Sequence, residues 1–426
     1  MTKSVTQRAP SLVPNKPKLA REKPLSIGIT CYPSVGGSGI LASQLGSEIA
    51  RLGHKVHFIS YEPPFRLDTK HPNIFFHKVE LNEYRLFKYP DYTLPLAVKM
   101  VEVANKYKLD VLHVHYAVPH ATAALLATQI AKDRALHTPC VITTLHGTDI
   151  TLLARDPNLG PIIKYSIESS SGVTAVSHSL KEETVQVLKT RKPIETIYNF
   201  YRVRTPKKTR AEVRKKLGLK ADDFVLIHLS NLRPVKRAED ILRVIGEVKD
   251  DPRIKLLVLA GGPFDPFRPM LTEFGIEDRV VVKSNVVDIE NYIAASDAGI
   301  YASERESFGM GVLETMSFGK PVVATRVGGV SEIVVEGETG FLKRLGDVKA
   351  MSKAVRKLAG DPELCARMGT AAKARAEQHF SAEASVAQYI AFYRRIMQEC
   401  GAPVRHDASR FQGDDLAVKI GATSGK

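Results

Sequence analysis

The stretch of residues 25–60, LSIGITCYPSVGGSGILASQLGSEIARLGHKVHFIS, decides the fold class. SIGITC is a short apolar run typical of a buried strand, and a glycine-rich turn follows it. Residues 40–52 have the apolar spacing of an amphipathic helix, which ends at Gly53. KVHFIS is the next strand. A strand, a helix and a second strand in this order predict a right-handed crossover within a parallel sheet.

The same alternation continues on the C-terminal side of this stretch. The predicted strands are DVLHVH, CVITTL and GVTAVS, and the predicted helices are ATAALLATQIA and SLKEETVQVL. The alternation then stops in a polar, basic segment over residues 199–220. Alternation resumes with DFVLIHL, KLLVLA, RVVVKS, AGIYAS and PVVAT. The pattern predicts an α/β protein with two doubly wound Rossmann-like domains that face a cleft, because repeated strand–helix units form parallel sheets covered on both faces.

The expected domain boundaries follow from these breaks. The first 24 residues carry six Lys/Arg and one Glu without apolar periodicity, which predicts a flexible basic arm over 1–24. Residues 25–200 are expected to form the first domain and 201–378 the second. A C-terminal helix over 379–400 is expected to pack back toward the first domain, and residues 401–426 are expected to form a flexible tail.

Composition limits the class of protein. Of the 426 residues, 44% are hydrophobic and 25% are charged, which excludes a mostly disordered or collagen-like chain. No uninterrupted apolar run approaches the roughly 18–20 residues of a membrane span. Four cysteines without a Cys-x-x-Cys pair, and no secretory signal, favour the reducing cytoplasm. The net charge of +15 suits nucleic acid, a membrane surface or a phosphorylated small molecule equally well.

Glycines follow the first predicted strand, at the edge where open α/β sheets bind ligands. Gly36, Gly37 and Gly39 let the backbone approach a ligand closely, and Ser38 with the helix start behind it suits an anion or a sugar. A tight strand-to-helix turn is the alternative. The loop has neither the Walker pattern nor Gly-x-Gly-x-x-Gly.

Histidines follow the next strands of the first half. In HVHYAVPH (113–120), alternation places the first two histidines on one face. Positions in the core or in the cleft wall are favoured over a metal pair, because no Asp, Glu or Cys lies at ligand spacing. Tyr116 and the last histidine, beyond the strand end, are better cleft candidates. In TTLHGTD (143–149), His146 is a candidate functional group, and Asp149 either joins it or only caps the next segment.

The second half carries cations after its first strand. SNLRPVKR (230–237) places Arg233 and Lys236 between a strand end and a helix start. An arginine fork and a lysine point charge in this position suit a diphosphate. A solvated basic helix start is the alternative.

Two carboxylates flank a later helix start. In SERESFGMGVLE (303–314), Glu306 lies in a loop where it can accept hydrogen bonds from ligand hydroxyls, and the glycine-containing helix start can donate to phosphate. Glu314 lies further along the helix, where it can reach a diol such as a ribose. The alternative is a helix with one glutamate at its start and one exposed to solvent. This alternative is less favoured because GKPVVATRVGG, another strand with a glycine turn at its end, follows directly.

These segments together resemble a known family. The Glu306-x7-Glu314 element, the Arg233/Lys236 loop and the first glycine-rich loop are similar to those of retaining glycosyltransferases of family 4, which have the GT-B fold. The phrases ITCYPSVGGSG, EPPFRL, HVHYAVPHA, TTLHGTDIT, SIESS, VTAVS, TIYNF and SNLRPVKR resemble the malate-accepting branch of that family. The resemblance covers about residues 25–400.

The resemblance implies transfer of GlcNAc from UDP-GlcNAc to the hydroxyl of L-malate with retention, the first step of bacillithiol biosynthesis. The first domain would bind the acceptor and the second the nucleotide sugar, without a cofactor and without a metal, since the chain has no Asp-x-Asp motif. The implied catalytic residues are His146, Arg233, Lys236 and Glu306. The implied donor-binding residues are Gly37, Asn199, Arg233, Lys236, Val287, Glu306, Phe308, Gly309, Met310 and Glu314, and the implied acceptor-binding residues are Ser38, Tyr116, Thr144 and Lys164.

The chain departs from the family pattern at three places. Many relatives place the diphosphate arginine where this chain has Asn231, so that Arg233 stands in for it, as expected in the malate-accepting branch. The turn at residues 260–263 lacks the usual acidic residue. Lys164 stands where an arginine that holds malate is expected, and a lysine keeps the charge but lacks the bidentate fork.

Three other functions remain open at this point. A family 4 enzyme could use another acceptor, such as an inositol phosphate, a lipid or a polysaccharide. A nucleic-acid-binding protein would use the positive charge, but no strand face interleaves aromatic residues with Lys/Arg. A catalytically inactive sugar-binding relative would not need the intact set of Arg233, Lys236, Glu306 and Glu314. A cytoplasmic enzyme without nucleic-acid partner or membrane span is expected, with a homodimer as the candidate assembly.

Overall fold

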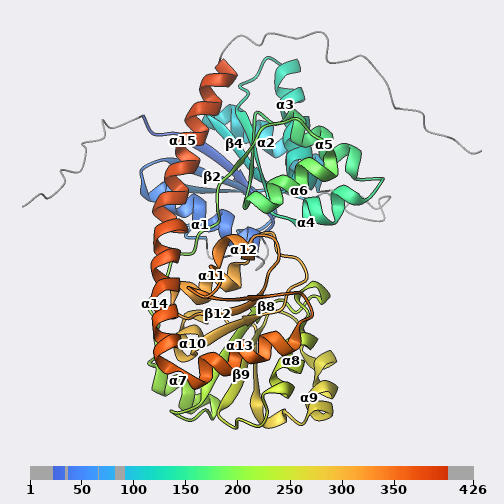
Figure 1. Ribbon diagram of the computed structural model, residues 1–426. Helices are drawn as coiled ribbons and strands as arrows, with labels where there is room; N and C mark the ends of the chain where they lie inside the picture. Colours follow the sequence, from blue (N-terminus) through green and yellow to red (C-terminus); the bar gives the residue numbers. More distant parts are fainter. Residues whose placement is uncertain (1–22, 34–36, 66, 82–91, 402–426) are drawn as a thin grey trace, which may run out of the picture.

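The computed structural model describes residues 23–33, 37–65, 67–81 and 92–401 of the chain. These residues form two lobes, one above the other in Figure 1, and each lobe is built on a parallel sheet. The first lobe has seven strands in the order β3-β2-β1-β4-β5-β6-β7. They are β1 (Ser26–Thr30), β2 (Lys55–Ser60), β3 (Ile74–Lys78), β4 (Val111–His115), β5 (Cys140–Leu145), β6 (Gly172–Ala175) and β7 (Ile194–Thr196).

The sheet of the second lobe has six strands in the order β10-β9-β8-β11-β12-β13. They are β8 (Phe224–Ser230), β9 (Ile254–Ala260), β10 (Val280–Ser284), β11 (Ala298–Tyr301), β12 (Val322–Thr325) and β13 (Gly340–Lys343). In each sheet the strand order reverses at a central pair, β1 beside β4 in one lobe and β8 beside β11 in the other. The predicted pair of doubly wound α/β sheets is therefore confirmed.

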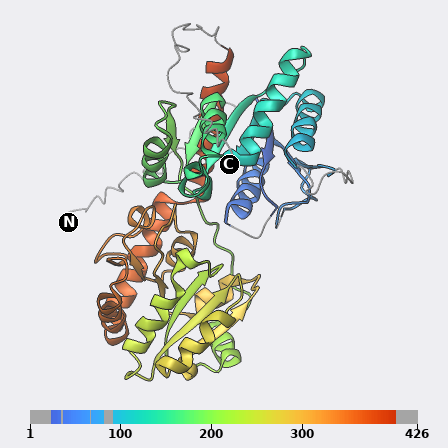
Figure 2. The same cartoon turned by 90° about the vertical axis from the view of Figure 1, so that its right-hand side faces the viewer.

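Helices cover the sheets of both lobes (Figures 1 and 2). Those of the first lobe are α1 (Gly37–Arg51), α2 (Thr93–Tyr107), α3 (Thr122–Asp133), α4 (Thr148–Thr151), α5 (Gly160–Ser169) and α6 (His178–Leu188). Those of the second are α7 (Arg210–Leu217), α8 (Ala238–Glu247), α9 (Arg268–Phe274), α10 (Ile289–Ala295), α11 (Met310–Ser317), α12 (Val330–Ile333), α13 (Val348–Gly360) and α14 (Pro362–His379). None of the helices in the described ranges combines the length and apolar character that a membrane crossing needs.

Every strand quoted from the sequence is present, with bounds within two residues of the expected ones. The strands that alternation did not reveal, β3, β7 and β13, lie at sheet edges and are three to five residues long. So short a run cannot establish a periodicity. Helix α1 begins three residues before the predicted start, because the glycines after β1 form its first turn rather than a longer loop.

The last helix, α15 (Ala382–Gly401), leaves the second lobe and runs back along the first (Figure 1). Tyr393 is fully buried there, and its hydroxyl lies 2.7 Å from Nδ1 of His113 on β4. At Gly172 on β6, a Cβ atom would lie 2.8 Å from the ring of Phe392, so a side chain at this position would push the helix away. The inner face of α15 is therefore part of the first lobe's core, together with Ala382, Val386, Tyr389 and Ile396.

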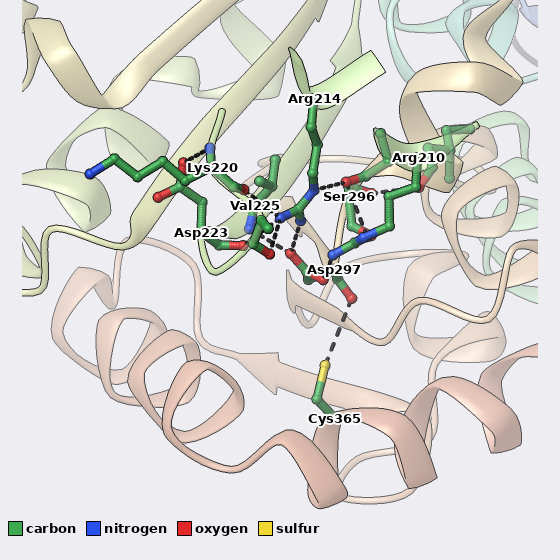
Figure 3. A network of polar contacts seen from close by, with 11 residues as sticks. Arg210, Arg214, Lys220, Asp223, Val225, Ser296, Asp297 and Cys365 are labelled. Atoms are coloured by element: carbon green, nitrogen blue, oxygen red, sulfur yellow. Dashed lines mark hydrogen bonds and ion pairs between the residues drawn. The ribbon is translucent and has the colours of Figure 1, made fainter. Parts of the chain in front are cut away.

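The basic segment between the lobes is fixed to the second lobe by internal ion pairs (Figure 3). Arg214 on α7 is almost fully buried and donates to the main-chain oxygens of Lys220, Ala221, Asp223 and Ala295. Its guanidinium also lies 2.6 Å from the carboxylate of Asp297, which Arg210 contacts at 2.5 Å. Two cations of this segment are thus used within the fold. The predicted arm (1–24) and tail (401–426) lie almost wholly outside the described residues.

Candidate active site

The predicted site residues follow the strands at which each sheet reverses its order. Ser38 follows β1 and Tyr116 follows β4, whereas Arg233 follows β8 and Glu306 follows β11. In open α/β sheets, the crevice outside the carboxyl ends of such a strand pair is the ligand-binding position. Each lobe therefore contributes one such edge to the candidate site.

The starts of two helices, one from each lobe, meet at this position. Helix α1 begins at Gly37 and α11 begins at Met310. A Cβ atom on Gly37 would lie 3.9 Å from Cγ of Met310, so the two predicted donor-binding residues are in close proximity. Unpaired N–H groups and the positive end of the dipole make a helix start favourable for an anion. Two starts at one point favour an anion held between the lobes.

A cation and a carboxylate of the second lobe form an ion pair. Lys236 Nζ contacts Glu306 Oε1, and their side chains are 18% and 17% exposed, so water screens the pair only in part. Ser303 Oγ donates to the same oxygen at 2.9 Å. The N–H of Glu304 donates to the carbonyl of Val235 at 2.8 Å, which ties the two loops together. The structure thus brings two predicted catalytic residues into direct contact.

The other charged residues of this lobe differ in exposure. Arg233 is exposed at the start of a 3-10 turn, Pro234–Lys236. Its neighbour Arg237 is held instead by Asp240 at 2.6 Å. Glu314 is half-buried on α11. Arg233 is therefore the more open of the two predicted diphosphate ligands.

The remaining donor candidates of the second lobe surround the start of α11. Gly309 has φ 109°, a conformation that favours glycine, and it places the N–H groups of the helix start at the loop after β11. Phe308 is buried in the core and supports this turn. Val287 is exposed after the edge strand β10, and Asn199 is buried in the segment that joins the lobes.

His146 is half-buried and lies against a cluster of buried imidazoles in the first lobe. Its Nε2 is 2.8 Å from Nδ1 of His115, and its ring centroid is 5.3 Å from that of Tyr116. Burial, and to a smaller extent the charge of the neighbouring His120, lower the pKa of His146 to about 3. His146 is therefore a neutral hydrogen-bonding group at neutral pH.

The alternative considered for Asp149, a cap of the next segment, is wrong, because Gly147 is the N-cap of α4 and no side chain caps that helix. Asp149 instead binds the main chain of two loops. Its carboxylate is fully buried and accepts from the N–H groups of Gly147 at 2.8 Å, His146 at 3.3 Å and Ala117 at 3.3 Å. Burial raises its pKa to about 6, although these backbone hydrogen bonds oppose the rise. Asp149 thereby fixes the loop that carries His146.

The candidate acceptor residues are partly brought together. Tyr116 has a pKa raised by burial and by the charge of Asp149, while hydrogen bonding by Ser38 and Thr148 and the charge of Arg233 lower it. Ser38 and Tyr116 therefore lie together, close enough to Arg233 to sense its charge. Thr144 is buried deeper.

The hydroxyl of Thr144 is 2.6 Å from Nε2 of His113 and 2.7 Å from the hydroxyl of Thr174, so it links the neighbouring strands β4, β5 and β6. Its carbonyl accepts the N–H of Tyr116 at 3.0 Å. Lys164 is half-buried on α5, and within the described ranges it forms no ion pair. Of the two positions left open for His113, the core and the cleft wall, the structure shows the core, since its side chain is fully buried.

Contacts that sequence reasoning missed join the two lobes. A Cβ on Gly147, which has φ 128°, would lie 1.7 Å from Ser307 Oγ, so the His146 loop packs directly on the residue after Glu306. Ser177 Oγ donates to the carbonyl of Ser307 at 2.5 Å. Glu332 reaches across from α12 to α6. The glycine turn before α12 was the one signal in the sequence near these contacts.

The arrangement combines a position for an anion between two helix starts with a partly buried lysine–glutamate pair on the second lobe. The first lobe contributes neutral imidazole and phenol groups. This arrangement can hold a phosphorylated ligand on the second lobe and a second ligand on the first. Within the described parts of the chain, no three His, Cys, Asp or Glu residues are grouped to hold a metal ion.

Comparisons with known proteins cover both lobes. Residues 35–204 match the family model described as Glycosyltransferase Family 4, and residues 209–375 match the model described as Glycosyl transferases group 1. The N-acetyl-alpha-D-glucosaminyl L-malate synthase of Bacillus anthracis is 42% identical over 377 residues, which are 88% of this chain and 98% of that protein. A D-inositol 3-phosphate glycosyltransferase of Streptomyces avermitilis is 31% identical over 185 residues, 40% of each chain.

Solved structures share the two-lobed fold. The Anabaena protein HepE in complex with UDP has a TM-score of 0.72 at 20% identity, covering 87% of this chain and 100% of that one. The sucrose-phosphate synthase of Thermosynechococcus elongatus has a TM-score of 0.71 at 21% identity, covering 88% and 100%.

Proposed function

Because this chain belongs to the family 4 glycosyltransferases and has their GT-B fold, we propose that it transfers GlcNAc from UDP-GlcNAc to the hydroxyl of L-malate. The anomeric configuration is retained, and the product is the first intermediate of bacillithiol biosynthesis. The observation that carries the proposal is the close approach of Gly37 to Met310, which brings the helix starts of the two lobes together. The ion pair of Lys236 and Glu306 supports it, since Glu306 lies in the loop that leads into the second of these helices.

The second lobe holds the donor in this proposal. Arg233 and Lys236 neutralise the diphosphate, and the N–H groups from Gly309 onward donate to its oxygens. Glu306 accepts from the sugar hydroxyls once the ligand separates it from Lys236, and Glu314 accepts from the ribose. Val287 lies on the uracil side. Charge stabilisation of the leaving UDP is the largest contribution asked of these residues.

The first lobe presents the acceptor to the same face of the sugar. Ser38 and Tyr116 hydrogen-bond malate, Lys164 supplies a cation for a carboxylate, and Thr144 holds Tyr116 in place. The bond from the anomeric carbon to the diphosphate breaks as the malate oxygen bonds to that carbon on the same side. The hydroxyl proton passes to the leaving diphosphate oxygen. His146 is neutral, so it donates a hydrogen bond to the transferred sugar and contributes no positive charge.

The absence of an Asp-x-Asp motif from the sequence supports transfer without a divalent metal. Cations and helix starts take over the neutralisation that a metal would otherwise provide. A cytoplasmic enzyme fits four cysteines that form no disulfide framework. A homodimer is proposed from the resemblance alone.

The test is UDP release by the purified full chain with UDP-GlcNAc, with and without L-malate, in the presence of EDTA. Release that requires malate and survives EDTA is expected. Release with another acceptor alone, such as an inositol phosphate, would make the chain a family 4 enzyme of different acceptor specificity. Malate-dependent release that stops in EDTA would refute metal independence and leave the transfer intact.

A further inference from the structure

Glu332 joins the two lobes close to the proposed site. From α12 in the second lobe, its carboxylate accepts hydrogen bonds from the N–H of His178 at 3.0 Å and of Ser179 at 2.8 Å. These are the first two residues of α6 in the first lobe. The N–H groups of a helix start lack partners within the helix, and the dipole favours a negative charge there. One side chain of the second lobe thus caps a helix of the first.

Tyr198, in the segment that connects the lobes, adds a third hydrogen bond. Its hydroxyl donates to Glu332 at 2.9 Å. Burial, followed by the hydrogen bond to Glu332 and its charge, raises the pKa of Tyr198 to about 12. The phenol therefore stays protonated and keeps donating across the neutral pH range.

The helix that carries Glu332 is fixed to the loop that carries Glu306. The N–H of Gly329 donates to the carbonyl of Glu306 at 2.9 Å. A Cβ on Gly328 would lie 2.1 Å from the same oxygen, so turn and loop pack backbone against backbone. Arg375 on α14 donates to the carbonyls of Glu332 and Ile333, at 2.7 Å each. A shift of α6 pulling on Glu332 would therefore move the Glu306 loop.

A second contact between the lobes lies one residue from Glu306. Ser177, the N-cap of α6, donates to the carbonyl of Ser307, and Gly147 packs on the Ser307 side chain. The start of α6 thus contacts the second lobe at two residues, Glu332 and Ser307. Both contacts set the distance between the donor lobe and the His146 loop.

We propose that Glu332 is a positioning residue that holds the lobes in the arrangement in which the Glu306 loop meets the acceptor side. The inference rests on the proposed transferase function. The proposed UDP contacts come chiefly from the second lobe, whereas transfer needs both lobes. Loss of Glu332 therefore lowers turnover and weakens the use of malate, while UDP still binds.

The experiment compares two sets of variants of the full chain. Glu332→Ala removes all three hydrogen bonds, and Glu332→Gln keeps the shape with a weaker acceptor. His178→Pro removes one N–H donor at the first helical position, where proline is tolerated, and Ser177 before it already has extended angles, φ −158° and ψ 161°. His178→Ala is the matched control, since it loses the same imidazole and keeps the N–H.

We expect Glu332→Ala to lower kcat/KM for malate about tenfold or more while the UDP dissociation constant stays within about twofold. Glu332→Gln recovers part of the loss, and His178→Pro falls about threefold below His178→Ala, in keeping with the loss of one hydrogen bond. Small-angle scattering with saturating UDP gives a larger radius of gyration for Glu332→Ala than for the parent chain.

Two outcomes overturn the inference. In one, Glu332→Ala keeps both the parent kcat/KM and the parent radius of gyration. In the other, UDP affinity falls as much as kcat/KM, which indicates a general packing role. If the parent chain itself releases no UDP with malate, the proposed function fails instead. In that case scattering and UDP binding still decide whether Glu332 holds the lobes together.

Discussion

At the edges of the two sheets where ligands are expected, the strand-end loops of the first lobe present neutral groups, whereas those of the second lobe present charged groups. Burial holds His146 neutral, and Tyr116 faces the site beside Ser38. Across from them, Lys236 and Glu306 form an ion pair, and Arg233 is exposed. The two sheets have the same winding, so the difference lies in the loops rather than in the fold. In the proposed reaction, one scaffold would thus serve a charged leaving group on one side and a hydrogen-bonding acceptor site on the other.

The largest effect should come from removing the cation of the charged lobe. Lys236→Ala is expected to lower kcat/KM about 10³-fold, because the diphosphate loses a cation and Glu306 is left without its partner. The UDP dissociation constant, measured by titration calorimetry, should rise by at least about tenfold. The nearby Arg237→Ala is the matched control, since Arg237 is paired with Asp240 instead. Unchanged UDP affinity in Lys236→Ala would contradict the assignment.

A smaller effect with a different signature is expected for the carboxylate of the same pair. Glu306→Gln should lower kcat about 10²-fold, because an amide is a weaker acceptor for the sugar hydroxyls. UDP affinity should stay within about threefold of the parent value, since Lys236 remains. Steady-state kinetics and UDP titration on the same preparation separate the two roles. Equal losses of both properties in both variants would remove the distinction between them.

Variants of Lys164, on the first lobe, test which residue binds a carboxylate of the dianionic acceptor. Lys164→Ala should raise KM for malate about tenfold with kcat nearly kept, whereas Lys164→Arg should match or improve on the parent by restoring a bidentate fork. The neighbouring, exposed Tyr165→Ala serves as the control on α5. If malate KM is the same in all three variants, the cation for malate must come from the second lobe.

The smallest effect on rate is expected from pH. The pKa of His113 and of His146 is lowered to about 3, and that of His120 to about 4, mainly by burial. These imidazoles stay neutral near pH 7, so kcat/KM should change by less than about twofold between about pH 6.5 and 8. A limb near pH 6.5 that disappears in His146→Gln would contradict a neutral His146.

Stability should nevertheless depend on pH. The folded pKa of each histidine lies below the ordinary value of 6.5, so its stabilising effect is complete above pH 6.5 and is lost as pH falls toward the folded value. Asp149, raised to about 6, acts in the opposite direction over pH 6 to 3.8. Three histidines outweigh one carboxyl, so Tm should fall on acidification. His146→Gln should reduce that slope in a thermal unfolding series.

The sequence was most informative where chemistry is local. Strand alternation located the loops after β1, β4, β8 and β11, and the segments SNLRPVKR and SERESFGMGVLE predicted Lys236 and Glu306 as functional residues, although not their contact with each other. Burial was harder to predict. Thr144 and Tyr116 lie on adjoining strand ends, yet one hydroxyl is enclosed and the other faces the site. Which of two strand-end residues is covered depends on neighbouring strands and on α15, both distant in sequence.

Contacts between the lobes could not be predicted from local pattern. The approach of Gly147 to Ser307 and the capping of α6 by Glu332 join residues more than 150 positions apart. These contacts depend on how the two folded lobes pack against each other, and the periodicity within either half of the sequence does not predict that packing. Gly147 and Gly328 lack the side chain that would prevent these close contacts. A glycine in a loop can be present for many other reasons, so neither residue predicts a contact on its own.

The return of α15 to the first lobe has a consequence for synthesis on the ribosome. Tyr389, Phe392 and Tyr393 fill the core over β4, β5 and β6, so that core is unfilled while residues 201–381 are being made. The lobe that emerges first is therefore the last to be completed, and its apolar groove must wait for the end of the chain. A stop codon before residue 382 would leave the second lobe nearly whole and would expose the core of the first lobe, at the opposite end of the chain.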